Sequence, residues 1–259
     1  MAAPVQSVGG GSDATAMKTT TLTVFAAASL TNAFSEIGTN FSSIHPDVRV
    51  VYNFAGSNQL AAQIGEGAPV DIFASANGTQ MNVAIEAGRI ISGTQRTFVR
   101  NRLVVVTPRD NPAGLSSLQD LATPGVKIIF AAAAVPVGEY SLVFLDKAEA
   151  DGSLGAGYKE AVIANLVSYE ENVRAVLTKV SLDEADAGIV YTSDVGAAAD
   201  EVVQIEIPDN LNTIANYPIA LLHDTPNREM AQQFVDFVLS PAGQEVLAKY
   251  GFTPTFEVK

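Results

Sequence analysis

Two serines stand where a strand gives way to a helix, and a serine in that position can help to bind an anion. Ser29 follows a short apolar run and precedes residues such as Phe34 and Phe41, which recur at helical spacing, so it occupies the place of a helix N-cap. Ser57 follows the strand-like Val48–Phe54 and a short turn, and it opens a second helical pattern. A helix start carries unpaired N–H groups and a partial positive charge, which a hydroxyl there supplements. If both serines face one crevice at the carboxyl ends of a parallel sheet, they predict a shared anion site. The alternative is two ordinary helix caps.

Length and composition exclude several classes of protein. The chain has 259 residues and no run of about 18 apolar residues, so no membrane span is expected. Its 15 basic and 28 acidic residues give a formal charge of −13, which argues against nucleic acid as a partner. A buried anion is not excluded, because surface charges are screened beyond ~10 Å in salt. The chain has no cysteine, and therefore no disulfide or thiolate metal site.

From Thr21 onward, short apolar strands alternate with helices, which predicts an α/β fold with parallel sheets covered on both faces. The predicted strands are Leu22–Ala27, Val48–Phe54, Val70–Ser75, Leu103–Thr107, Lys127–Ala131, Gly188–Thr192, Val202–Ile207 and Tyr217–Leu222. The predicted helices are Leu30–Phe41, Asn58–Gly65, Gly78–Ala87, Val137–Ala150, Tyr158–Ala164, Asn172–Val180, Arg228–Leu239 and Pro241–Tyr250.

Short blocks spread over the chain from Thr21 to Phe252 follow the order of one known family. These blocks are Phe25–Thr31, Phe54–Ser57, Gly67–Ser75, Asn101–Pro108, Val135–Tyr140, Glu171–Arg174, Gly188–Asp194 and Tyr217–Leu221. In them the chain resembles the periplasmic molybdate-binding proteins of bacterial ABC importers. No single block is diagnostic, but their common order is a strong signal.

The resemblance implies a two-lobed periplasmic-binding-protein fold of type II. Each lobe would be a mostly parallel sheet flanked by helices, and two crossover strands, Arg102–Pro108 and Tyr217–Leu221, would join the lobes. Residues 21–101 and 216–259 would form lobe I, and residues 102–215 would form lobe II. Two lobes joined in this way can close around a ligand by a hinge motion.

The resemblance also implies a ligand, molybdate or tungstate, and a set of residues that hold it. The matching positions are Ser29, Ser57, Val137, Val173 and Tyr191. The two valines lie at predicted helix starts and would donate a backbone N–H, whereas Tyr191 would donate its phenolic hydroxyl. Neutral donors suit a fully ionised tetrahedral dianion, while phosphate, partly protonated near neutral pH, would need a carboxylate acceptor. Sulfate is the alternative ligand. We expect no cofactor and no direct metal ligand.

Glu139 lies two residues beyond the expected Val137 donor. One interpretation is a solvent-facing acid in the first turn of a helix, stabilised by the helix dipole. The other is a carboxylate that coordinates the metal centre of the anion directly. Both interpretations stay open at this point.

An enzyme would need a base or a metal, and the chain has two histidines, His45 and His223. Neither lies in a nucleophile or zinc motif. By residue type alone, Ser193 and Asp194 could form a hydrolase triad with His223. No glycine-rich phosphate-binding or dinucleotide-binding motif is present. We therefore predict no catalytic residue. A sensor or adhesion module that has lost its ligand site is a further alternative, against which the serine pair and Tyr191 argue.

The resemblance places the protein in the periplasm, or anchored outside the cytoplasmic membrane, as a monomer that delivers its anion to the permease of an ABC importer. Residues 1–20 are rich in Gly, Ala and Ser and lack the apolar core of a signal peptide, so we expect a flexible tether without an export signal. Four arginines gather near the presumed crossover, where they predict a solvated hinge surface or, alternatively, a contact with the permease. They are Arg96, Arg100, Arg102 and Arg109.

Overall fold

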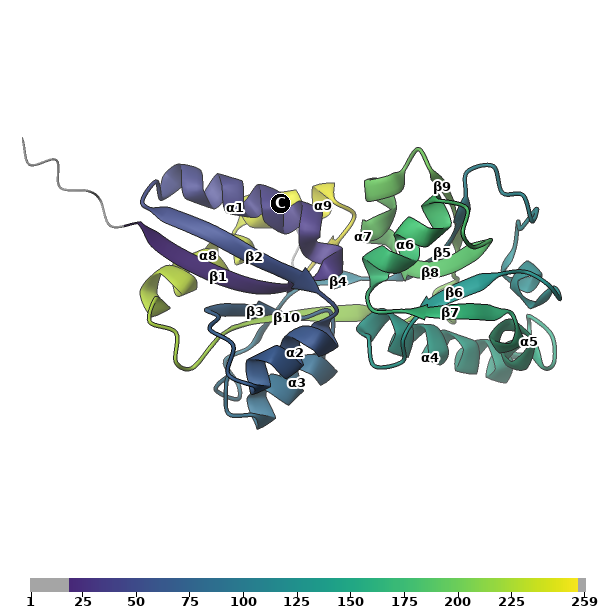
Figure 1. The fold of residues 1–259 in the computed structure, drawn as a ribbon, viewed down its shortest axis with the longest axis horizontal. Helices are drawn as coiled ribbons and strands as arrows, with labels where there is room; N and C mark the ends of the chain where they lie inside the picture. Colours follow the sequence, from purple (N-terminus) through teal and green to yellow (C-terminus); the bar gives the residue numbers. More distant parts are fainter. Residues whose placement is uncertain (1–18, 256–259) are drawn as a thin grey trace, which may run out of the picture.

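The computed structural model describes residues 19–255, and the expected leader up to residue 18 lies outside the described residues. Two β-sheets lie side by side, each with helices on both faces (Figure 1). This arrangement confirms the predicted α/β class, but both sheets mix parallel and antiparallel pairs, whereas mostly parallel sheets were predicted. Within the described range, no helix combines the length and the apolar character needed to cross a membrane.

The first sheet has the strand order β11-β4-β10-β3-β1-β2. Its strands are β1 (Thr20–Ala27), β2 (Val48–Ala55), β3 (Ile72–Ala74), β4 (Arg96–Asn101), β10 (Ala215–Leu221) and β11 (Thr253–Pro254). β1 runs parallel to β2 and β3, whereas β10 runs antiparallel to β3 and β4. Because Ala27 pairs with Ala55, the segments that follow β1 and β2 leave the sheet at the same edge. That shared edge brings the two serine segments together.

Helices cover both faces of the first sheet (Figure 1). They are α1 (Thr31–Ile44), α8 (Arg228–Leu239) and α9 (Pro241–Lys249) on one face, and α2 (Ser57–Gly65) and α3 (Gly78–Glu86) on the other. α1 turns Phe34 and Phe41 inward, and both rings pack against Phe234 of α8 at centroid distances of 6.3 and 5.2 Å. This aromatic packing holds the start of α1 against the edge of the sheet from which Ser29 emerges.

The second sheet has the strand order β7-β6-β8-β5-β9. Its strands are β5 (Leu103–Pro108), β6 (Ile128–Ala131), β7 (Leu166–Glu170), β8 (Ala187–Tyr191) and β9 (Val202–Glu206). The helices around it are α4 (Pro136–Asp151), α5 (Tyr158–Ala164), α6 (Val173–Ser181) and the short α7 (Thr192–Val195). β6 runs parallel to β7 and β8, so α4 and α6 begin near the carboxyl ends of parallel strands. This is the edge that faces the first sheet (Figure 1).

The chain passes from the first sheet to the second at Arg102, between β4 and β5, and returns between β9 and β10. β5 and β10, the strands that the resemblance assigned to the crossovers, each belong to one sheet. The passages therefore lie in the segments just before these two strands. The lobe boundaries near residues 101 and 216 stay a prediction.

Most predicted elements are present, with ends that differ by a few residues, but the sequence patterns do not predict β4, β7 or β11. β4 buries Phe98 and Val99 in succession and exposes its arginines, so it lacks the alternation of a half-buried strand. β7 lies at the edge of its sheet, and its Val167 and Tyr169 are 57% and 56% exposed. Apolar residues that face solvent give no signal of a buried strand.

Candidate functional site

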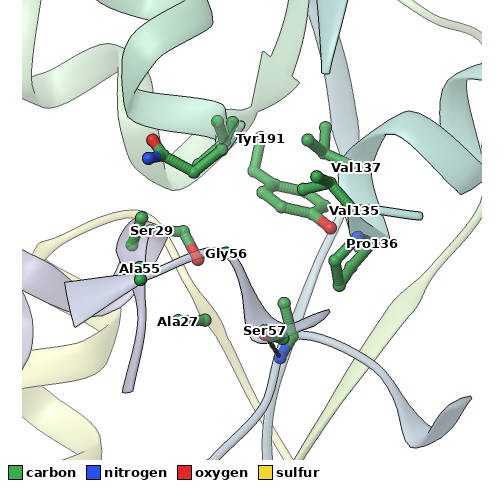
Figure 2. A pocket seen from close by; sticks show the side chains of 13 residues that line it. Ala27, Ser29, Ala55, Gly56, Ser57, Val135, Pro136, Val137 and Tyr191 are labelled. Atoms are coloured by element: carbon green, nitrogen blue, oxygen red, sulfur yellow. Dashed lines mark hydrogen bonds between the residues drawn. The ribbon is translucent and has the colours of Figure 1, made fainter. Parts of the chain in front are cut away.

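A pocket between the two sheets brings together all of the residues that the resemblance assigned to anion binding (Figure 2). Ser29, Ser57, Val137, Val173 and Tyr191 all line it, and it holds about 210 Å³ of space free of atoms, including its mouth. The rest of the lining is small or apolar, with one asparagine, and no charged side chain of the described chain lines the pocket. Any charge on a ligand here would therefore be met by neutral donors. We call the elements around the first and second sheets the first and second halves of the site.

The first half contributes two serines, and neither of them is an N-cap. Ser29 lies in the 3-10 turn η1 (Ala28–Leu30), and Leu30 is the N-cap of α1. Ser57 is the first residue of α2, whose N-cap is Gly56. The cap assignment of Ser29 was therefore wrong, because an extra 3-10 turn precedes the α-helix.

Both serine hydroxyls are instead bonded to groups of the first half. The Ala76 N–H donates to Ser57 Oγ over 3.0 Å, and Ser29 Oγ lies 3.0 Å from the Tyr217 hydroxyl. Both serines are almost fully buried. Ser57 accepts its bond and so keeps its own proton to donate into the pocket, whereas either oxygen can be the donor between Ser29 and Tyr217.

The second half contributes helix starts. Val137 lies in the first turn of α4 and Val173 is the first residue of α6. The first N–H groups of a helix have no intrahelical acceptor and point along the axis, here toward the pocket that both valines line. The side chain of Asn172 caps α6 by accepting from the Ala175 N–H over 3.0 Å. At Gly138 an added Cβ would come within 2.1 Å of the Ala132 carbonyl oxygen, so glycine allows α4 to begin close against the end of β6.

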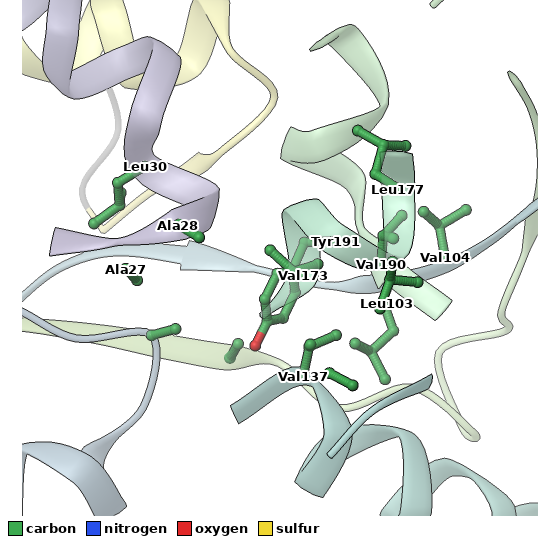
Figure 3. Close-up of a cluster of buried hydrophobic side chains, with 14 of the residues drawn as sticks. Ala27, Ala28, Leu30, Leu103, Val104, Val137, Val173, Leu177, Val190 and Tyr191 are labelled. Carbon is green, nitrogen blue, oxygen red and sulfur yellow. The ribbon is translucent and has the colours of Figure 1, made fainter. Parts of the chain in front are cut away.

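Tyr191 ends β8 and is 1% exposed. Its ring lies among apolar side chains that include Val137 and Val173 (Figure 3), and it packs edge-on against Tyr217 at 5.8 Å. Its hydroxyl has no hydrogen-bond partner within residues 19–255. Burial raises the pKa of Tyr191 well above its ordinary value, so the phenol stays protonated. A buried unpaired phenol at a pocket is a donor suited to an anion, since an unpaired polar group is costly to bury.

A buried ion pair that the sequence did not predict lies behind Tyr191. The Arg174 Nε atom is 2.9 Å from Asp194 Oδ1, and the Tyr191 N–H donates to Asp194 Oδ2 over 3.3 Å. Asp194 is fully buried, and this burial raises its pKa to about 6, against the opposing effect of Arg174. Arg174 does not line the pocket. The sequence offered Asp194 only as a possible member of a hydrolase triad with Ser193 and His223.

Glu139 lies in the first turn of α4, as one interpretation expected, but its side chain is half-buried rather than solvent-facing, and coordination of a metal centre stays the untested alternative. Its Oε2 atom accepts a hydrogen bond of 2.8 Å from the Asn77 amide, so it links α4 to the loop before α3. Gln59 donates to Glu171 over 3.3 Å in a similar contact between the halves. Glu139 does not line the pocket, and no metal-binding group of His, Cys, Asp and Glu occurs in the described part of the chain.

The hydrolase triad has no geometric support among the described residues, where no hydrogen bond joins His223 to Ser193 or Asp194. The Ser193 hydroxyl accepts from the Asn101 amide over 2.8 Å, and Asp194 pairs with Arg174. His223 lies beyond the end of β10, where its carbonyl oxygen accepts from Arg228.

Comparison with known proteins gives consistent results. A family model described as bacterial extracellular solute-binding protein matches residues 22–253. The molybdate-binding protein ModA of Mycobacterium tuberculosis (strain H37Rv) is 36% identical over 89% of this chain and 84% of its own length. ModA of Escherichia coli (strain K12) is 34% identical over 90% of this chain and 88% of its own length. The solved periplasmic molybdate-binding protein of Azotobacter vinelandii is 20% identical and covers 91% of this chain and 100% of its own, with a TM-score of 0.78. The last likeness confirms the two-lobed fold class predicted from the sequence.

Proposed function

Because this chain belongs to the bacterial extracellular solute-binding protein family, we propose that it binds molybdate or tungstate and delivers the anion to the permease of an ABC importer. It acts outside the cytoplasmic membrane, in the periplasm or on an anchor, and as a monomer. The named relatives bind molybdate, and the pocket contains the donors that such an anion needs. No catalytic step, cofactor or nucleic acid takes part.

The observation that carries this proposal is a pocket of neutral donors drawn from both halves. A dianion loses a very large solvation energy when it leaves water, so it needs several donors already aimed at it. The hydroxyls of Ser29, Ser57 and Tyr191 and the first-turn N–H groups at Val137 and Val173 all border the same pocket. Each charge-assisted bond contributes ~1.5–3 kcal/mol net. A handful of such bonds supports tight binding without a lysine or an arginine.

Sulfate is the second candidate ligand. It is also a fully ionised tetrahedral dianion, so the same donors suit it, and only the size of the closed pocket separates it from molybdate and tungstate. Phosphate is disfavoured because its remaining proton needs an acceptor. The pocket lining contains no carboxylate among the residues that the structure describes.

Calorimetric titration of the full chain with molybdate, tungstate, sulfate and phosphate tests the proposal. We expect submicromolar dissociation constants for molybdate and tungstate and far weaker binding of the other two anions. A molybdate concentration ~1,000-fold above the dissociation constant should stabilise the fold by ~4 kcal/mol and raise its melting temperature. Tight binding of sulfate together with weak binding of molybdate would show that sulfate is the ligand. Binding of phosphate as tight as that of molybdate would refute the proposal that the site consists of neutral donors only.

A further inference from the structure

We propose that Asn101 and Tyr217 are positioning residues that compel the Ser29 hydroxyl to donate into the pocket and so give the site its preference for fully deprotonated anions. This inference rests on the proposed function. Asn101 ends β4 at the passage between the sheets, and Tyr217 lies on β10. Both side chains are almost completely buried, and neither lines the pocket.

The orientation of the Asn101 amide is fixed by a backbone group. The Arg102 N–H donates to Asn101 Oδ1 over 3.0 Å, and the Thr192 hydroxyl donates to the same oxygen over 3.1 Å. A flipped amide would place its NH₂ group against the Arg102 N–H, which can only donate. Asn101 Nδ2 is therefore the donor in its other contacts, 2.8 Å to Ser193 Oγ and 3.3 Å to the Tyr217 hydroxyl oxygen.

The proton of the Tyr217 hydroxyl then has one acceptor left among the described residues, because the neighbouring Tyr191 hydroxyl forms no hydrogen bond there. Its oxygen accepts from Asn101, so its own proton needs an acceptor. Among the described residues its remaining hydrogen-bond partner is Ser29 Oγ, at 3.0 Å. Burial raises the pKa of Tyr217 well above its ordinary value, so this proton is retained. Tyr217 donates, and Ser29 accepts.

The Ser29 hydroxyl cannot donate its own proton to Tyr217, because that contact already holds the Tyr217 proton. Its oxygen is occupied by the Tyr217 donor, and it lines the pocket, so its O–H points toward a ligand there. The direction of donation thus runs from Asn101 through Tyr217 and Ser29 to the anion. An anion oxygen that carries a proton would meet a second donor at this point. The Asn101–Tyr217 pair therefore favours deprotonated over protonated anions, in addition to raising the affinity for the anion.

Tyr217→Phe tests this role because it keeps the ring and removes the donor. Without that donor the Ser29 hydroxyl can turn and accept a proton from a protonated anion. We expect molybdate binding to weaken about tenfold, phosphate binding to stay unchanged or strengthen, and the preference for molybdate over phosphate to fall by tenfold or more. Tyr158→Phe is the matched control, since it removes another buried tyrosine hydroxyl, one that donates to the Leu118 carbonyl over 2.8 Å. Equal weakening of both anions, or no change, would overturn the proposal.

A measurement without ligand separates this inference from the proposed function. The signal of the Tyr217 hydroxyl proton can be assigned in the proton NMR spectrum of the wild type, because it is missing from the spectrum of Tyr217→Phe. We expect this proton to exchange slowly with water and to show a nuclear Overhauser contact to the Ser29 β protons. A rapidly exchanging hydroxyl, or one without that contact, would overturn the direction of donation even if molybdate binds. A protected hydroxyl with that contact, in a protein that binds no molybdate, would uphold the direction of donation and refute the proposed function instead.

Discussion

The first half of the pocket offers side-chain hydroxyls, whereas the second half offers first-turn backbone N–H groups and one phenol. Ser29 is oriented by a neutral chain of buried partners, while Tyr191 is backed by the Arg174–Asp194 ion pair. Hydroxyls can turn, so their direction has to be imposed by neighbours. Backbone N–H groups are fixed by the helix and are indifferent to the side chain. The two halves should therefore respond differently to substitution and to pH.

Val173→Pro should have the largest effect, because it removes a backbone donor without removing the helix start. Proline is well tolerated at the first position of a helix, and the preceding Asn172 already has φ −161° and ψ 170°, a conformation that proline allows in its neighbour. We expect molybdate binding to fall below detection by calorimetry while the far-ultraviolet circular dichroism is unchanged. A folded Val173→Pro variant that binds normally would show that this N–H is not a donor.

The ion pair behind the second half should make stability depend on pH. The folded-state pKa of Asp194, about 6, lies above its ordinary 3.8, so the folded protein holds the proton more tightly than the unfolded chain. The contribution of Asp194 to the free energy of unfolding therefore falls as pH rises from about 4 to about 6, by about 3 kcal/mol, and is constant above that. Urea unfolding of the wild type and Asp194→Asn at several pH values should show this difference. Identical pH profiles would mean that the pKa of Asp194 is the same in the folded and the unfolded protein.

Ser29→Ala and Ser57→Ala should each weaken molybdate binding by ~10–150-fold, the loss of one bond to a charge of ~1.5–3 kcal/mol. Each also leaves a buried donor unpaired, the Tyr217 O–H or the Ala76 N–H, so the free energy of unfolding should fall by about 1–3 kcal/mol. Calorimetry and urea unfolding measure the two effects separately. If the variants lose stability but keep their affinity for molybdate, both serines have a structural role only.

The sequence could predict the junctions of the site but not its supporting contacts. Strand and helix periodicities placed Ser29 and Ser57 at strand-to-helix connections and Val173 at a helix start, because such patterns are local. The partner of Ser29 is Tyr217, 188 positions away, and that contact depends on the packing of β10 in the first sheet. The periodicity also could not distinguish a 3-10 turn from an N-cap at Ser29, because the apolar residues of α1 recur in the same way after either.

Tyr191→Phe should affect affinity and stability in opposite directions, unlike either serine variant. The hydroxyl has no partner within residues 19–255, so its removal takes away a polar group that is unfavourable to bury. We expect molybdate to bind about tenfold more weakly and the ligand-free protein to melt at a slightly higher temperature. Differential scanning calorimetry with and without molybdate measures both quantities. A lower melting temperature without ligand would show that the hydroxyl has a partner in the folded protein.

Val137→Ala should have the smallest effect, and it tests the difference between the halves most directly. Alanine keeps the N–H that the first turn of α4 presents, and the donor position does not depend on the side chain. The valine is 1% exposed, so its truncation removes buried methyl groups and should lower the free energy of unfolding by about 1–2 kcal/mol. Affinity for molybdate, measured by calorimetry well below the melting temperature, should change less than twofold. A tenfold loss would mean that this side chain shapes the cavity, and the second half would then recognise its ligand through side chains, as the first half does.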